Sequence, residues 1–176
     1  MKGLEDQTFL VGYLISNAFA LILLFFSVFF PKVARVLFFI LFASASYINW
    51  KLSLQSPEDY VRTSEAALGI YRLFITGWFS KHVVLVVGSI ATAQSFIAVS
   101  LLLKGWFYKA GVIGAIVFLV AIMPLGIASA FPSTLIMAYA MVWLLKEKPD
   151  YVWKKQTKSN KRFNIRKFTS HSLYQS

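Results

Sequence analysis

Long apolar runs dominate the pattern of this chain. Residues 8–30, 82–103 and 110–145 contain no Lys, Arg, Asp or Glu, and the shorter run 36–50 contains none either. An α-helix rises about 1.5 Å per residue, so about 20 apolar residues cross a hydrocarbon core of about 30 Å. The pattern therefore predicts a bundle of membrane-spanning helices.

The run 110–145 is too long for one crossing, because a single helix of that length would extend about 54 Å. Pro124–Gly126 and Ser129–Pro132 are the segments at which we expect it to break, since Pro interrupts the helical hydrogen-bond ladder. We therefore predict a transmembrane bundle over residues 1–148 and a basic tail over 149–176. The five spans of the bundle cover about residues 8–30, 33–50, 82–103, 109–127 and 131–145.

The connection between the second and third spans carries a helix-start signal. Ser56 is a suitable N-cap, Pro57 suits the first helical position, and Glu58 and Asp59 suit the first turn. Apolar residues then recur at helical spacing up to Trp78. The pattern predicts an amphipathic interfacial helix, either a cover that only packs on the bundle or a lid over a ligand. The expected fold class is all-α, a polytopic transmembrane helix bundle.

Composition narrows the chemistry. The chain is 58% hydrophobic, only 14% of its residues are charged, and it has no Cys. Thiol catalysis, disulfide exchange and Cys-based metal sites are therefore excluded. Its two His residues, His82 and His171, fall on opposite sides of the membrane in this scheme, so they cannot share a metal or a haem. We expect no metal site, no intrinsic cofactor and no catalysis from this chain alone.

Basic residues indicate the orientation. Lys32, Arg35, Lys104 and Lys109 lie at two turns on the same side as the segment after Leu145, which holds nine of the 18 Lys and Arg residues. The positive-inside rule then predicts a cytoplasmic C-terminus and an outside N-terminus in a bacterial inner (plasma) membrane. An even number of crossings, with span one or five re-entrant, would instead place both termini inside.

The Ser, Thr, Asn and Gln residues within the spans are few and none of them is ionisable, while His82 lies at the interface. Asn49 and Gln94 are either helix–helix hydrogen-bonding groups or contacts to a ligand. In the second reading Asn49, Tyr71, Gln94 and Ser95 are the polar contacts of a mostly apolar pocket.

The tail interleaves basic and aromatic residues. Beside a membrane span, this pattern favours binding to anionic lipid or docking to a partner protein over binding to nucleic acid, which we do not expect. The basic candidates are Lys154, Lys155, Lys158, Lys161, Arg162, Arg166 and Lys167.

From Val33 to Lys148 the chain resembles the DoxX-like family of small bacterial membrane proteins. The resemblance rests on Ala34–Leu37, Leu41–Ala45, the connection with Pro57 and Tyr60, Ala93–Ala98 and Leu101–Gly105. It implies a four-helix core in the inner membrane, here with one extra N-terminal span. Some members resemble small subunits of thiosulfate:quinone oxidoreductases or belong to oxidative-stress assemblies. In such proteins the position of Gln94 or Ser95 is often an acid, which this chain lacks.

Two functional hypotheses follow. The first is a non-catalytic integral membrane subunit or scaffold of a larger assembly, with a quinone-linked redox complex as the class that the resemblance implies. Its partners would be membrane lipids and other membrane subunits or further copies of this chain. The second is a binder of a small apolar ligand, such as a quinone or lipid, in an outer-leaflet pocket under residues 57–79.

Overall fold

The computed structural model describes residues 7–62, 69–147 and 150–153, and the described part is helical with no strand. The prediction of an all-α fold is therefore confirmed. The elements in chain order are α1 (Gln7–Phe29), α2 (Pro31–Gln55), α3 (Glu58–Arg62), α4 (Gly69–Thr76), the 3₁₀ turn η2 (Phe79–Lys81), α5 (Val83–Leu102), α6 (Gly105–Ile122), the 3₁₀ segment η3 (Met123–Ser129) and α7 (Ser133–Leu145).

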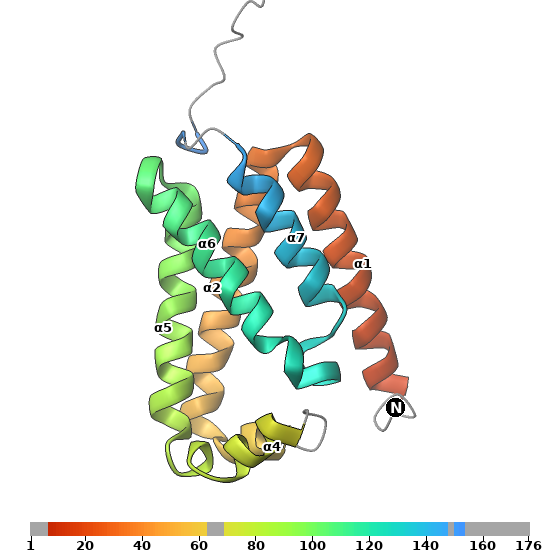
Figure 1. Cartoon of the computed structure of the whole chain (residues 1–176), viewed down its shortest axis with the longest axis vertical. Coiled ribbons are helices and arrows are strands. Elements are labelled where there is room, and N and C mark those ends of the chain that lie inside the picture. The colour runs from red at the N-terminus through yellow and green to blue at the C-terminus, as the bar shows by residue number, and fades with distance from the viewer. Residues whose placement is uncertain (1–6, 63–68, 148–149, 154–176) are drawn as a thin grey trace, which may run out of the picture.

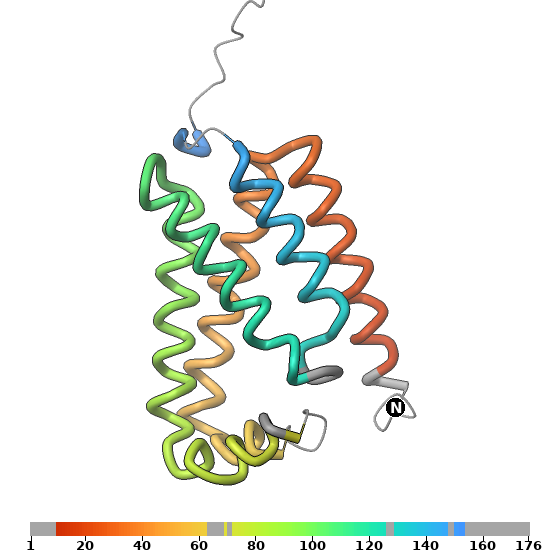
Figure 2. Tube along the Cα trace, in the orientation of Figure 1, coloured from red at the N-terminus to blue at the C-terminus, as the bar shows by residue number. Residues whose placement is uncertain are grey.

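The long helices form a ring in which each one contacts its two neighbours. The order around the ring is α1, α2, α5, α6, α7 and back to α1. Helix α1 begins at the lower end of Figure 1, where α3 and α4 lie, and α7 ends at the upper end. We call these the α4 end and the Arg35 end, after the helix and the residue that mark them. The tube in Figure 2 follows the chain back and forth between the two ends.

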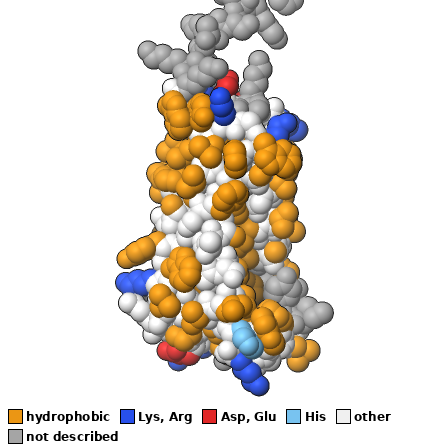
Figure 3. All heavy atoms as spheres, turned by 90° about the vertical axis from the view of Figure 1, so that its left-hand side faces the viewer, with side chains coloured by type: hydrophobic (Ala, Val, Ile, Leu, Met, Phe, Trp, Pro, Cys, Tyr) orange, Lys and Arg blue, Asp and Glu red, His pale blue; other side chains and the backbone are white. Residues whose placement is uncertain are grey.

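Four helices are long and apolar enough to cross a membrane: α1, α2, α5 and α6. Large apolar side chains such as Leu14, Leu85 and Val117 are exposed along them. In Figure 3 apolar side chains cover the length of the bundle, and charged ones lie towards its ends. A soluble monomer does not present such a surface, and lipid covers it without cost. The chain is a multi-pass helical membrane protein, as predicted.

Helix α7 is shorter than the predicted fifth span. It has 13 residues, which corresponds to about 20 Å. Segment η3 and a reversal at Ala130, where φ is 55°, occupy the part of the chain that a full crossing would need. The two predicted break segments are thus both used, and α7 begins within the depth of the bundle (Figure 1).

The predicted interfacial helix is present as separate short pieces. Helices α3 and α4 and turn η2 lie across the α4 end, while residues 63–68 between the helices are outside the described residues. Ile75 and Phe79 pack with Val83 and Val87 of α5, which attaches this layer to the bundle. Trp78 remains 53% exposed, as expected for an aromatic anchor at a membrane interface.

The main apolar core lies towards the Arg35 end and includes Phe38, Phe42, Leu101 and Met141. Helices α5 and α6 approach closely there, because a Cβ at Gly111 would lie 2.6 Å from the Cβ of Ser100. Small residues at four-residue spacing therefore serve contacts within this bundle. Gly88 of α5 likewise allows a close contact within the bundle, because it lies against the ring of Trp50 of α2.

Candidate functional site

The candidate site is a set of polar side chains between α2 and α5. Phe38, Phe42, Ser46 and Asn49 recur at spacings of three and four on the α2 face that turns towards α5 and the core. Ser46 Oγ donates to the carbonyl of Ala91 at 2.6 Å and lies 2.7 Å from Ser95 Oγ. Because the one hydroxyl proton of Ser46 is used on Ala91, Ser95 is the donor in the second bond.

A second chain of hydrogen bonds runs from the covering layer into the bundle. Tyr60 of α3 donates its hydroxyl to Asn49 Oδ1 at 2.8 Å, and Asn49 Nδ2 donates to Gln94 Oε1 at 2.8 Å. Burial raises the pKa of Tyr60, so the phenol stays protonated and keeps donating at neutral pH. These directions leave the amide nitrogen of Gln94, Nε2, with two N–H donors and no hydrogen bond to a described residue.

Of the predicted ligand contacts whose side chains are described, Asn49 and Gln94 meet and Ser95 makes a separate contact. Asn49 and Gln94 are bonded to each other, which is the helix–helix alternative of the sequence analysis. Gln94 is only 2% exposed, whereas Ser95, the next residue of α5, lies on the exposed side of the helix. The side chain of Tyr71 is outside the described residues. Neighbouring positions on a helix point about 100° apart, which explains why Gln94 and Ser95 separate.

Ser95 opens into a groove of about 340 Å³ on the outer side of the α2–α5 pair. Apolar and aromatic residues form most of its wall, and the Ser46–Ser95 hydroxyl pair is its polar part. The lining residues are Phe39, Ala43, Ser46, Tyr47, Trp50, Ser95, Ala98 and Val99. A groove of this kind suits an apolar chain with one hydrogen-bonding group.

At the opposite end Arg35 forms a buried clamp. The side chain is 3% exposed, and its guanidinium donates to three backbone carbonyls, those of Leu101 at 2.7 Å, Leu103 at 2.5 Å and Asp150 at 2.6 Å. The first two carbonyls belong to the end of α5, where backbone acceptors have no partner within the helix. A cation there also interacts favourably with the helix dipole.

An aromatic residue completes the clamp. The guanidinium carbon of Arg35 lies 4.1 Å from the ring centroid of Tyr108, and the Tyr108 hydroxyl donates to the carbonyl of Leu144 at 2.7 Å. Arg35 and Tyr108 therefore join four parts of the chain, namely α2, the end of α5, the start of α6 and the end of α7 together with Asp150.

From the sequence, Arg35 was expected only to contribute a surface charge to the positive-inside rule, and its contacts in the clamp were not predicted. A signal was present, because Arg35, Phe38 and Phe42 recur at helical spacing on one face of α2. A basic residue on the apolar face of a helix next to a turn can reach the carbonyls of a neighbouring helix end.

The remaining predicted residues have mixed outcomes. Lys154 to Lys167, the basic tail candidates, lie outside the described residues. His82 uses Nδ1 towards the Trp78 carbonyl at 2.9 Å and stacks on the Trp78 ring. Within the described ranges there is no group of three side chains that could hold a metal ion.

Comparison with known proteins gives no relative. No protein-family model, no curated protein and no solved structure matches this chain.

Proposed function

We propose that this chain is a non-catalytic integral membrane subunit, or scaffold, of a larger membrane assembly. The observation that carries the proposal is the Arg35 clamp, because it fixes the point at which the basic tail leaves the bundle. Seven basic residues, Lys154 to Lys167, follow this exit in the sequence. Such a segment is suited to a partner or to anionic lipid.

Contacts just beyond the clamp support this role. The Lys104 ammonium lies 5.0 Å from the ring centroid of Tyr151, and the rings of Tyr151 and Trp153 stack at 4.7 Å. The clamp and this aromatic pair hold residues 150–153 against the bundle, so the tail would begin from a platform. We place the platform in the cytoplasm and the start of α1 outside, in a bacterial inner membrane, since nine of the 18 basic residues of the sequence follow Leu145.

The resemblance to DoxX-like proteins favours a quinone-linked redox complex as the class of assembly. The test is native mass spectrometry and affinity capture from membranes solubilised in several mild detergents. We expect the full-length chain to retain a defined partner or a second copy, and a chain that stops at Trp153 to lose it. Recovery of the same lone monomer from both proteins would refute the proposal.

A second candidate function is binding of a small apolar ligand. The observation that favours it is the amide nitrogen of Gln94, Nε2, which offers two N–H donors inside an otherwise apolar bundle. A quinone carbonyl is an acceptor of the matching kind, and it brings no charge into the membrane interior.

Lipid extraction and mass spectrometry of the purified protein would test this candidate. We expect a quinone or lipid to be enriched over the bulk membrane, and Gln94→Leu to abolish the enrichment. Ser95→Ala distinguishes the groove from the inner position, because Ser95 lines the groove and Gln94 does not. No enriched species, or equal enrichment in wild type and Gln94→Leu, would exclude Gln94 as the contact.

A further inference from the structure

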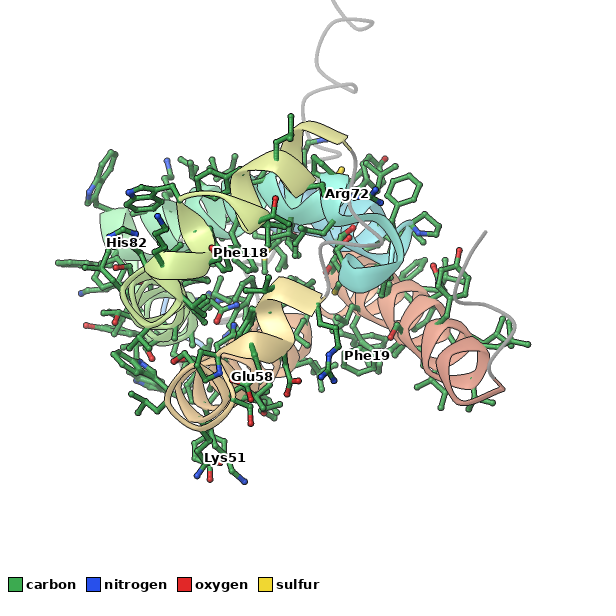
Figure 4. The ribbon with its side chains drawn as sticks, turned by 90° about the horizontal axis from the view of Figure 1, so that it is seen from below. Phe19, Lys51, Glu58, Arg72, His82 and Phe118 are labelled. Atoms are coloured by element: carbon green, nitrogen blue, oxygen red, sulfur yellow. The ribbon has the colours of Figure 1, made fainter. Side chains whose placement is uncertain are left out.

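A cavity with both signs of charge lies at the α4 end, and neither the Asn49–Gln94 pair nor the Arg35 clamp lines it. Its volume is about 600 Å³, and it separates α3 from the start of α5. The lining residues are Pro57, Glu58 and Val61 on one side and Ser80, Lys81, His82, Val83, Val84 and Leu85 on the other. Glu58 and His82 are labelled in Figure 4, which views this end of the bundle.

The charges of the cavity are not neutralised by one another. Neither Glu58 nor Lys81 makes an ion pair with any described residue, and both side chains are exposed. His82 uses Nδ1 on the Trp78 carbonyl, which leaves its Nε2 for another partner. The cavity therefore offers a carboxylate acceptor, an ammonium donor and an imidazole nitrogen to a ligand.

The cavity lies at the level of the bundle where lipid headgroups are expected. It adjoins the first turn of α5, a helix long and apolar enough to cross a membrane. The exposed Trp78 marks the interfacial level, and in Figure 3 the pale blue His lies on the surface close to a basic side chain and below the apolar band. Val84 and Leu85 are 44% and 64% exposed and continue from the cavity along the lipid-facing side of α5.

We propose that this cavity binds the headgroup of a phospholipid that carries a phosphate and a primary ammonium. Lys81 binds the phosphate oxygens, Glu58 and the free Nε2 of His82 accept from the ammonium, and an acyl chain follows Val84 and Leu85. A purely anionic headgroup fits less well, because Glu58 repels it. A quaternary ammonium fits less well too, since it has no N–H to donate to Glu58.

The test uses native mass spectrometry of the detergent-purified full-length chain. It is titrated with phosphatidylethanolamine and with phosphatidylcholine of identical acyl chains, and the apparent Kd of each is measured. We expect phosphatidylethanolamine to bind about tenfold more tightly, the usual effect of one charged hydrogen bond. Lys81→Gln should weaken both lipids about tenfold, and Glu58→Gln should remove the difference between them.

Two controls separate the site from general effects. Lys51→Gln removes a charge on α2 at the same end of the bundle, at a residue that does not line the cavity, and should change neither Kd. Lys81→Arg keeps the charge and should keep the binding, which distinguishes a lost contact from a lost fold.

Three results would overturn the proposal: equal affinity of wild type for the two lipids, unchanged binding in Lys81→Gln and Glu58→Gln, or an equal loss in Lys51→Gln. A fourth result is displacement of the lipid by millimolar inorganic phosphate. It would assign the cavity to a soluble phosphate ligand in place of a lipid.

Discussion

Replacing Arg35 by Leu tests whether the clamp holds the Arg35 end together. The substitution keeps an apolar stem of similar position and removes the guanidinium that donates to three backbone carbonyls. It leaves the carbonyls of Leu101 and Leu103 without the donor that they have in the wild type. It also uncovers the Tyr108 ring, which the guanidinium approaches to 4.1 Å.

The expected loss can be worked from these contacts. A buried acceptor that loses its partner costs about 1–3 kcal/mol, and a cation–π contact in a buried place adds about 1–2 kcal/mol. Removal of the cost of burying the guanidinium offsets part of this sum. We therefore expect the free energy of unfolding to fall by about 3 kcal/mol, which corresponds to roughly 6–12 °C in Tm for a chain of this size.

Thermal unfolding in a mild detergent, followed by the loss of helical signal, measures this change. Tyr108→Phe is the matched control, because it keeps the ring under Arg35 and removes only the hydrogen bond to Leu144, worth about 1 kcal/mol. Arg35→Lys should fall between wild type and Arg35→Leu, since one ammonium cannot match the planar fork of a guanidinium.

The reasoning would be refuted by a Tm of Arg35→Leu equal to that of wild type. A loss no larger than that of Tyr108→Phe would also refute it, because the clamp would then contribute nothing beyond one neutral hydrogen bond. Arg35→Lys adds a direct check, as a Tm below that of Arg35→Leu would contradict the role of the positive charge.

Three further predictions concern other parts of the molecule. Gly111→Leu should lower the free energy of unfolding by about 1–3 kcal/mol, because even a Cβ there would lie 2.6 Å from the Cβ of Ser100. Denaturant titration measures this change, and unchanged stability would argue against the close α5–α6 contact. Asn49→Ala should cost about 1 kcal/mol in the same titration, at about 0.6 kcal/mol for each of its two side-chain hydrogen bonds, and a neutral effect would argue against the chain from Tyr60 to Gln94. Truncation after Trp153 should leave Tm unchanged and weaken attachment to anionic vesicles at low salt. Charge attraction is screened over about 8 Å at physiological ionic strength, so equal binding of the full-length chain at low and high salt would contradict the tail prediction.

The helices were predictable because the apolar interior of a membrane restricts which residues a crossing segment can contain. A crossing segment needs about 20 apolar residues and must satisfy its backbone internally, so the uncharged runs locate α1, α2, α5 and α6 closely. Even the break near Pro124 and Pro132 follows from the excess length of residues 110–145. The short length of α7 did not follow, because an apolar run does not reveal how much of it lies in 3₁₀ turns.

The polar site was predictable only in part. Asn49 and Gln94 stood out because amides are rare in spans, and the structure joins them. The contact between Ser95 and Ser46 was not predicted, because it depends on how α5 is rotated against α2. Helical periodicity gives the angle between neighbouring side chains, but the register between two helices 45 residues apart comes from packing.

The clamp and the amide pair have one physical reason in common. Both join α2 to α5, one at the Arg35 end and one towards the α4 end, and between them lies the core formed by Phe38, Phe42 and Ile97. Apolar surface alone gives weak preference for one helix register in lipid, because lipid chains compete for the same contacts. Directional hydrogen bonds at two separated levels remove that freedom, so the few polar residues of α2 determine how α5 is placed. The positions of the groove, of the tail exit and of the charged cavity at the start of α5 then follow from that pair of helices.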